Sequence, residues 1–330
     1  MRVAITGSTG FLGRHIVDRL APDHDLVCIS RSGRAPDGCE SKKIDIVKGR
    51  GLKAAFAKAD VVVHAAGLVS HSLDRAAETW AVHVTGTANV LEAARTARVR
   101  RFIHLSTSGT VAVSTEPGVV STESSPSPDS LIATWPYYRS KLYSEQMVMS
   151  ASGIDAVILN PTLLLGPGDE WGGASTHAVS TFLDFGMPVA PSGTVSFVDV
   201  RDVAQAVELA LTEGQPGHRY LLGAANMSFH QFYSRLARMS GGEEPIMAMP
   251  ALTRQALKWF PQWGKDNGIS AGIGPVIRRE ELELASHHWS VDSTKAIKAL
   301  GWNPRGPNET LEDTLLDLTE KRRQRFDRFK

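Results

Sequence analysis

Short apolar runs alternate with longer segments of helical spacing along the first half of this sequence. The runs occupy residues 3–5, 26–29, 61–65, 102–105 and 156–159. Segments 13–20, 74–97 and 137–152 carry apolar residues three and four positions apart, as a helix with one buried face does. Because this alternation is typical of βαβ units around a parallel sheet buried on both faces, we predict a doubly wound α/β fold.

A glycine-rich turn directly follows the first run. Residues 6–13 read Thr-Gly-Ser-Thr-Gly-Phe-Leu-Gly, and helical spacing begins within them. The first glycine of such a turn permits the tight bend, the second lets the backbone approach a pyrophosphate, and the third lets the helix pack closely on the strand. The helix N-terminus then offers unpaired N–H donors to the phosphates. We therefore predict a dinucleotide site with contacts from Gly7, Thr9, Gly10, Phe11 and Leu12.

The end of the second run distinguishes between the two nicotinamide dinucleotides. A carboxylate there binds a free ribose hydroxyl, whereas an arginine accommodates a 2′-phosphate. The residues are Ser30, Arg31, Ser32, Gly33 and Arg34, without an acid. Arg31 and Arg34 therefore favour NADP(H), and NAD(H) is the second candidate. In the alternative interpretation both arginines are only solvated side chains on a surface loop and bind no phosphate.

The regular alternation loosens after about Pro161 into loops rich in glycine, proline and serine. Such a region behind a nucleotide-binding sheet usually forms a smaller substrate lobe. Segment 200–211 regains helical spacing and is expected to return to the main sheet. We predict a dinucleotide-binding domain that comprises residues 1–160, with residues 195–225 folded back onto it. Residues 161–194 and 226–330 are predicted to form a smaller C-terminal substrate-binding lobe.

Tyr137 and Lys141 stand four residues apart at the start of the segment 137–152, on one face of the predicted helix. A phenol with a pKa of about 10 is a poor acid or base at neutral pH, but a neighbouring ammonium stabilises the phenolate and lowers that pKa. We expect Tyr137 to exchange a proton with a substrate oxygen. Such a pair also arises by chance on surfaces, and its position after a strand that ends in hydroxyl residues favours the catalytic interpretation.

Ser106, Thr107 and Ser108 follow the run at 102–105. The carboxyl ends of parallel strands are where open α/β sheets bind ligands, so one of these hydroxyls is placed to hydrogen-bond a carbonyl oxygen as charge develops on it. The spacing does not distinguish among the three. Satisfying backbone groups in a turn is the alternative use of such residues.

Several motifs in order resemble the extended short-chain dehydrogenase/reductases of the NAD-dependent epimerase/dehydratase type, which have a Rossmann fold. The likeness covers almost the whole chain, at residues 6–13 (TGSTGFLG), 60–67 (DVVVHAAG), 86–94 (GTANVLEAA), 137–141 (YYRSK), 160–169 (NPTLLLGPGD), 197–204 (FVDVRDVA) and 300–305 (LGWNPR). It implies a catalytic set of Tyr137, Lys141 and Thr107, with Thr107 in the place usually held by serine. Tyr137 and Lys141 then also contact the cofactor.

The resemblance implies further cofactor contacts. Asp45 and Ile46 fall where the family contacts the adenine, and Pro161 and Thr162 fall beside the nicotinamide. Ala65, Ala66 and Gly67 fall where the protein backbone passes the cofactor. His83 departs from the family, which often has asparagine there, so no proton or water relay is assigned to it. Dimerisation through the long helices is usual in the family, and we expect a homodimer.

Residues 160–167 look more like dihydroflavonol and cinnamoyl-CoA reductases, or hydroxysteroid dehydrogenases, than like sugar-nucleotide epimerases, which commonly carry arginine where Asn160 stands. This implies an NADP(H)-dependent oxidoreductase that reduces a ketone or aldehyde of a fairly apolar small molecule, or oxidises the alcohol. The alternatives are a sugar-nucleotide epimerase or dehydratase with bound NAD, and a cofactor-binding regulatory protein without catalysis. The aromatic block 257–263 is either a lid over such a ligand or part of a core.

Composition excludes several other classes of function. The net charge of +1, with acids and bases interleaved, does not suggest a nucleic-acid partner. No stretch approaches the roughly 18 uncharged apolar residues of a membrane-spanning helix. Cys28 and Cys39 are the only cysteines, and the histidines lack ligand spacing, so we predict neither a disulfide framework nor a metal site. We expect a cytoplasmic protein.

Overall fold

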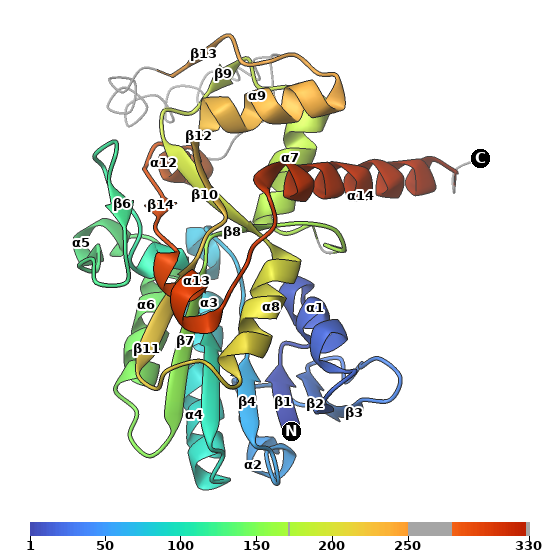
Figure 1. The fold of residues 1–330 in the computed structure, drawn as a ribbon, viewed down its shortest axis with the longest axis vertical. Helices are drawn as coiled ribbons and strands as arrows, with labels where there is room; N and C mark the ends of the chain where they lie inside the picture. Colours follow the sequence, from blue (N-terminus) through green and yellow to red (C-terminus); the bar gives the residue numbers. More distant parts are fainter. Residues whose placement is uncertain (171, 250–278, 328–330) are drawn as a thin grey trace.

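A seven-stranded parallel sheet forms the centre of the molecule (Figure 1). The computed structural model describes residues 1–170, 172–249 and 279–327. The strand order is β11-β7-β5-β4-β1-β2-β3, and every neighbouring pair is parallel, which confirms the predicted doubly wound fold. The strands are β1 (Arg2–Thr6), β2 (Asp25–Ser30), β3 (Glu40–Lys43), β4 (Val61–His64), β5 (Arg101–Leu105), β7 (Asp155–Pro161) and β11 (His218–Leu222).

Successive side chains of the central strands point to opposite faces of the sheet. Val3 of β1 lies in one core layer with residues of α1 (Phe11–Leu20) and α8 (Val200–Ala210). Its neighbour Ala4 lies in the opposite layer, with residues of α4 (Gly86–Thr96). Every residue of β4 and β5 is buried. Burial on both faces explains why these strands read as continuous apolar runs.

Further helices cover the sheet and build the second lobe. Among the described residues, no helix combines the length and the apolar character needed to cross a membrane. These helices are α2 (Leu52–Ala55), α3 (Ala76–Trp80), α5 (Asp129–Ile132), α6 (Pro136–Met149), α7 (Ala174–Phe185), α9 (Phe229–Ser240), α12 (Arg279–Ala285), α13 (Thr294–Leu300) and α14 (Pro307–Asp327), with the short 3-10 turns η1 (Leu73–Arg75) and η3 (Ser108–Thr110).

The segment 74–97, predicted as one regular helix, contains a π-helical turn, η2 (Ala81–Thr85), between α3 and α4. The helix passes very close to the loop after β3 at this point, because a Cβ on Gly86 would lie 2.7 Å from Ile46 Cδ1. A π turn adds a single residue to one turn of helix, so the spacing of apolar residues did not reveal it. The prediction of regular helix was wrong at this turn.

The sheet has two edge strands, β3 and β11, that the apolar pattern did not predict as strands. The sequence of β3 is Glu-Ser-Lys-Lys, and three of its four residues are exposed. It is held by backbone pairing with β2, from Val27 opposite Glu40 to Ser30 opposite Lys43. An edge strand of this kind gains little from apolar burial, and charged residues there discourage pairing with other chains.

A smaller lobe lies beyond the carboxyl ends of the main strands, in the upper part of Figure 1. Phe197, Phe232 and Leu311 from three of its elements share one core. Within segment 195–225, α8 packs on the main sheet and β11 joins it, whereas β10 belongs to the small sheet. The small strands are β8 (Leu163–Leu165), β10 (Thr194–Asp199) and β12 (Ala225–Ser228) in the order β12-β10-β8, with the pairs β9 (Val189–Ala190) with β13 (Met247–Ala248) and β6 (Val120–Ser121) with β14 (Ser290–Val291).

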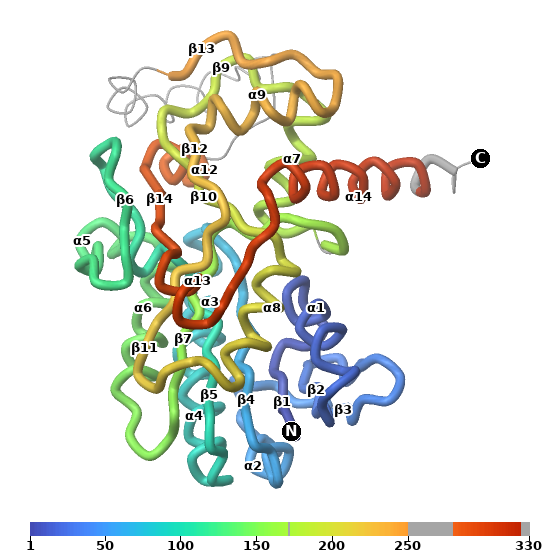
Figure 2. The backbone as a smooth tube through the Cα atoms, in the orientation of Figure 1, coloured from blue at the N-terminus to red at the C-terminus, as the bar shows by residue number. Residues whose placement is uncertain are grey.

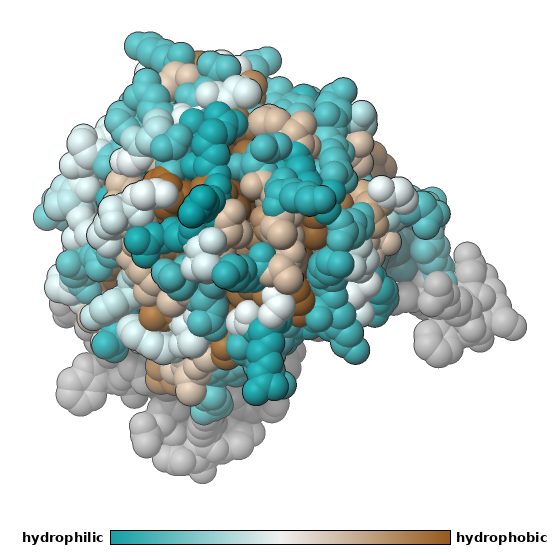
Figure 3. All heavy atoms as spheres, turned by 90° about the horizontal axis from the view of Figure 1, so that it is seen from below, coloured by the Kyte–Doolittle hydropathy of each residue, from teal (hydrophilic) through white to brown (hydrophobic). Residues whose placement is uncertain are grey.

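Helix α14 lies beside α7, as the tube view shows (Figure 2). Lys321 Nζ donates to the carbonyl of Asp169 at 3.0 Å, and Arg322 Nη2 donates to the carbonyl of Ser180 at 2.9 Å. These two basic residues near the end of α14 therefore attach the helix to other segments of the lobe. Seen from below, polar side chains cover most of the surface, with apolar ones in small groups between them (Figure 3). The aromatic block 257–263 lies outside the described residues.

The close packing of the glycine turn generates a stability prediction. A Cβ on Gly13 would lie 2.0 Å from the carbonyl oxygen of Gly7, and backbone cannot swing aside as a long side chain can. Gly13→Ala is expected to lower the free energy of unfolding by about 3 kcal/mol, measured by urea denaturation. Gly306→Ala is the control, because nothing lies within 4 Å of its Cβ, and its effect should stay within about 0.5 kcal/mol. Equal effects of the two substitutions would contradict this packing.

Candidate active site

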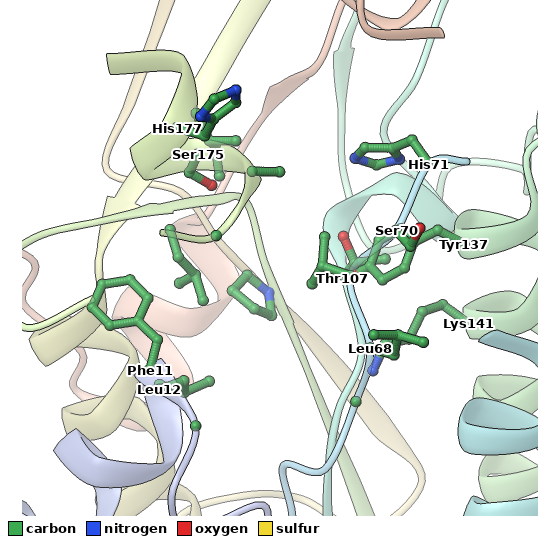
Figure 4. Close-up of a pocket in the computed structure, with 18 of the residues that line it drawn as sticks. Phe11, Leu12, Leu68, Ser70, His71, Thr107, Tyr137, Lys141, Ser175 and His177 are labelled. Atoms are coloured by element: carbon green, nitrogen blue, oxygen red, sulfur yellow. The ribbon is translucent and has the colours of Figure 1, made fainter. Parts of the chain in front are cut away.

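A deep cleft separates the glycine turn from the start of α6, at the carboxyl ends of the main strands (Figure 4). Its volume of about 3330 Å³ exceeds the roughly 300–1,000 Å³ of a site for one small molecule. Both the main sheet and the smaller lobe line it. The structure brings all the predicted site residues to this cleft, namely Gly7, Thr9, Gly10, Phe11, Leu12, Arg31, Arg34, Asp45, Ile46, Ala65, Ala66, Gly67, Thr107, Tyr137, Lys141, Pro161 and Thr162.

The glycine turn is pressed against the backbone that follows β4. Gly7 has a φ of +76°, and a Cβ there would lie 2.6 Å from the backbone nitrogen of Ala66. On the cleft side, a Cβ on Gly10 would meet only the carbonyl oxygen of Gly7, at 3.3 Å. Gly10 also precedes the first turn of α1, whose N–H groups have no partner within the helix. An open backbone surface beside a helix N-terminus fits the pyrophosphate of the predicted dinucleotide.

The loop after β2 lines the end of the cleft at which the adenosine is predicted to lie. Arg31 and Arg34 are exposed on it and line the cleft. The Ser30 hydroxyl accepts the N–H of Gly33 at 3.0 Å, which fixes the bend between the two arginines. Asp45, predicted to lie by the adenine, accepts the N–H of Val47 with its Oδ1 at 2.9 Å. Two guanidinium groups at this end favour a ligand with an added phosphate.

Thr107, Tyr137 and Lys141 face the glycine turn from the other side of the cleft (Figure 4). Tyr137 and Lys141 lie on α6 and are 9% and 6% exposed, and Thr107 follows β5. The side chains of Tyr137 and Thr107 lie beside each other (Figure 4). Lys141 Nζ donates to the carbonyl of Leu105 at 2.8 Å, which holds its ammonium below the phenol. Of the hydroxyls that the spacing left open, Thr107 lies beside Tyr137, whereas Ser106 donates to Glu145.

Burial shifts the pKa values of both α6 groups toward their neutral forms. It raises the pKa of Tyr137 to about 12, while the neighbouring Thr107 side chain acts in the lowering direction. It lowers the pKa of Lys141 to about 8, against the charge of Glu145, which raises it. The prediction of a lowered phenol pKa was therefore wrong for this structure, because the loss of water around the phenolate raises the pKa more than Thr107 lowers it.

Glu145 is a site residue that the sequence analysis missed. It is 1% exposed, and its Oε2 accepts from Ser106 Oγ at 2.5 Å, Thr110 Oγ1 at 2.8 Å and Asn160 Nδ2 at 2.8 Å. Its Oε1 lies 3.0 Å from Arg219 Nη1. One carboxylate therefore ties the ends of three strands to the catalytic helix. Its place one helical turn after the catalytic lysine was the available signal.

Three buried histidines surround the lysine without converging on a metal geometry. His64 is hydrogen-bonded through both ring nitrogens. Its Nδ1 lies 2.7 Å from Thr6 Oγ1, and its Nε2 lies 2.9 Å from Thr87 Oγ1. Its ring stacks on His104 at 5.4 Å. Burial lowers the pKa of His64 to about 3 and of His83 to about 2, and lowers that of His104 as well, with the charge of Lys141 acting in the same direction. All three rings are neutral near pH 7.

An aromatic wall continues from the tyrosine toward the smaller lobe. His71 stacks on Tyr138 with ring centroids 5.7 Å apart, and Tyr138 lies 5.1 Å from Trp289. Trp289 stacks on Trp135 at 6.0 Å. His71 also meets Tyr137 edge-on at 5.6 Å. These rings come from segments up to 218 residues apart, from His71 to Trp289, so no local pattern pointed to them.

Comparison with known proteins agrees with this arrangement. The model of the NAD dependent epimerase/dehydratase family matches residues 3–223. The chain is 28% identical to a Synechocystis protein that carries the name dihydroflavonol 4-reductase, over 95% of this chain and 92% of the relative. It is 30% identical to sterol demethylase protein B of Methylococcus capsulatus, over 97% of this chain and 99% of the relative.

A solved structure shares the fold. The UDP-glucose 4-epimerase of Thermus thermophilus, in complex with NAD, superposes with a TM-score of 0.72 at 23% identity, over 97% of this chain and 99% of that one. The resemblance inferred from the motifs is confirmed, and so is an NAD(P)-dependent enzyme of the oxidoreductase or epimerase type. The chain belongs to the NAD-dependent epimerase/dehydratase family.

Proposed function

We propose that this protein is an NADP(H)-dependent carbonyl reductase, or the reverse alcohol dehydrogenase, acting on a fairly apolar small molecule. The observation that carries the proposal is the pair of Tyr137 and Thr107, whose side chains lie beside each other and face the glycine turn across the cleft. A carbonyl oxygen placed between their hydroxyls would lie next to a dinucleotide that rests on the turn.

In this proposal the dinucleotide is held by the residues that line its path. Gly7, Gly10 and the N-terminus of α1 receive the pyrophosphate, and Arg31 and Arg34 receive the 2′-phosphate. Asp45 and Ile46 would contact the adenine, and Pro161 and Thr162 would contact the nicotinamide. The protein backbone from Ala65 to Gly67 would pass alongside the cofactor. When bound, the cofactor supplies the hydride for reduction or accepts it in oxidation.

Tyr137 acts as a general acid in the reducing direction. With a pKa of about 12 its phenol is protonated at neutral pH, and an alkoxide that develops on the substrate is a far stronger base than a phenolate. Thr107 donates or accepts beside the same oxygen and keeps the phenol oriented. Lys141, with a pKa of about 8, is largely charged at pH 7 and stabilises the phenolate left after proton transfer.

The aromatic wall supports an apolar substrate. His71, Tyr138 and Trp289 present ring surfaces to the cleft beside Tyr137. Flat apolar groups gain from contact with such surfaces. The names of the two relatives, a dihydroflavonol reductase and a sterol demethylase protein, point to substrates of this kind.

The arrangement around Asn160 weighs against the epimerase alternative. Asn160 Nδ2 donates to Glu145 Oε2 at 2.8 Å and to the carbonyl of Thr107 at 3.0 Å, and the residue is fully buried. Where sugar-nucleotide epimerases commonly carry an arginine, this chain has a side chain turned into the protein. A panel of carbonyls and alcohols with NADPH and NADH, run beside nucleotide sugars, tests the two activities. Isomerised nucleotide sugar without carbonyl reduction would overturn the proposal.

A homodimer is also proposed, through the outer faces of α3 and α6. Trp80 and Tyr143 are 38% and 45% exposed there. The guanidinium carbon of Arg139 lies 5.7 Å from the ring of Trp80 and 5.9 Å from that of Tyr143. Exposed aromatic residues around an arginine are enriched at protein interfaces.

Removing the phenol hydroxyl tests the proposed acid. Tyr137→Phe is expected to lower kcat at least about 100-fold, because the proton then has no positioned donor. Its Kd for NADPH, followed by nucleotide fluorescence, should change by less than about threefold. Tyr143→Phe, on the exposed face of the same helix, is the matched control and should retain full activity. Near-normal turnover in Tyr137→Phe would exclude this mechanism.

The pKa of Lys141 generates a pH dependence. The ratio kcat/KM for NADPH reports groups of the free enzyme. Since the ammonium has a pKa of about 8, it loses its charge as the pH rises through that value, and kcat/KM should fall above it. Lys141→Arg keeps its charge to a pH above about 12, so the decline should disappear from its profile, even if its activity is lower. An unchanged decline in this variant would show that another group titrates.

Arg31→Ala tests the choice of cofactor. Loss of one charged contact with the 2′-phosphate should raise the KM for NADPH about tenfold. The KM for NADH should stay nearly constant, because NADH has no such phosphate. Arg95→Ala on the outer face of α4 serves as a control for the loss of a surface charge. Equal changes for both cofactors in Arg31→Ala would remove the basis for NADP(H) preference.

A further inference from the structure

We infer that His83 is a positioning residue, a neutral clamp between the cofactor side of the cleft and the catalytic helix, and that it does not relay protons. The effects on catalysis that we expect from this clamp rest on the proposed function. Its structural core, a hydrogen bond between the His83 ring and the Leu68 amide, is independent of which reaction the protein performs.

His83 lies in the π-helical turn η2, and such turns are frequent at functional sites because they redirect a side chain. The residue is 1% exposed, and its ring still reaches the lining of the cleft. It meets Tyr137 edge-on, with ring centroids 5.5 Å apart and planes at 70°. A helix without the extra residue would aim this side chain elsewhere.

The two ring nitrogens bind two different elements. Nε2 accepts the backbone N–H of Leu68 at 3.0 Å, in the segment that follows β4. Nδ1 lies 2.8 Å from Ser140 Oγ on α6. Ser140 Oγ in turn donates to the carbonyl of Tyr137 at 2.8 Å. The ring therefore bridges the cofactor side of the cleft to the first turn of the catalytic helix.

Only one protonation state satisfies all these bonds. The amide of Leu68 is a donor, so Nε2 must be the unprotonated nitrogen. The single hydroxyl proton of Ser140 goes to the Tyr137 carbonyl, so its oxygen accepts from Nδ1–H. The imidazole is thus neutral, with the proton on Nδ1. A proton on Nε2 would set two donors against each other.

The surroundings of the ring also favour the neutral imidazole. Burial lowers the pKa of His83 to about 2, and the neighbouring Lys141 and His64 lower it further. A Cβ on Gly67 would lie 3.3 Å from His83 Nε2 and 3.6 Å from Lys141 Nζ. An imidazolium would therefore place a second cation beside the ammonium. Over the working range of pH, the Nδ1 proton is therefore held by Ser140 and Nε2 is occupied by the Leu68 amide.

Loss of the clamp would leave the Leu68 amide without its partner at the wall of the cleft. Gly67 and Leu68 would then be free to move relative to Lys141 and Tyr137, which lie on the other side of the ring. The expected effect is weaker binding of the dinucleotide and a lower kcat, without a change in the groups that titrate.

Two variants separate the bonds made by the two nitrogens. In His83→Gln the amide oxygen can reach the place of Nε2 and accept from Leu68, whereas in His83→Asn the shorter amide can reach only the place of Nδ1. Thermal unfolding of each variant checks that it folds, and His83→Gln serves as the conservative rescue.

The first readout is hydrogen exchange of the Leu68 amide, followed by NMR on protein with isotopically labelled leucine. Exchange should be at least about tenfold faster in His83→Asn than in the wild type, and within about threefold of it in His83→Gln. Equal protection in all three proteins would overturn the clamp. This readout needs neither cofactor nor substrate, so it stands even if the proposed reductase activity fails.

The second readout is function. His83→Asn should bind NADPH about tenfold more weakly, and His83→Gln within about threefold of the wild type. The pH profiles of kcat/KM should keep the same apparent pKa values in both variants. If both variants lost one limb of the profile, and glutamine did not restore activity, His83 would be a proton relay and the inference would be wrong.

Discussion

The backbone contact between Gly13 and Gly7 is the constraint on which the rest of this structure depends. It lets α1 begin directly at the end of β1, with a Cβ on Gly13 excluded by a distance of 2.0 Å to the Gly7 carbonyl oxygen. The same turn is pressed against Ala66 after β4. The helix N-terminus and the segment after β4 therefore meet at one edge of the sheet, and the cleft forms where they do.

The catalytic helix is held against that edge by buried polar groups. Glu145 receives bonds from the ends of β5 and β7 and pairs with Arg219 of β11, and His83 bridges Ser140 to the segment after β4. The Glu145 carboxylate and the Asn160 amide nitrogen each have several partners, which lets a polar network stay rigid in a protein interior. Removing one member leaves the others without partners, at a cost larger than the mean value of one bond.

Burial also decides the chemistry of the pair on α6. The attraction between an ammonium and a phenolate favours an acidic tyrosine, but the loss of water around both groups acts against both charged forms. In this chain burial is the larger effect, so the pKa of Tyr137 is about 12 and that of Lys141 about 8. Both directions agree with the role proposed for Tyr137 as a proton donor, and they make the charge of Lys141 sensitive to moderately alkaline pH.

Local patterns in the sequence were sufficient for the position of the buried strands along the chain, the glycine turn and the spacing of Tyr137 and Lys141, because each depends on residues close together in the chain. They did not reveal the edge strand β3, which backbone pairing holds, or the π turn that aims His83. Only the tertiary structure decided the partners of Glu145, the wall that includes Trp289 and the direction of the pKa shifts. Those features depend on contacts between distant segments and on how much water the folded chain excludes, and neither is encoded in any short stretch of residues.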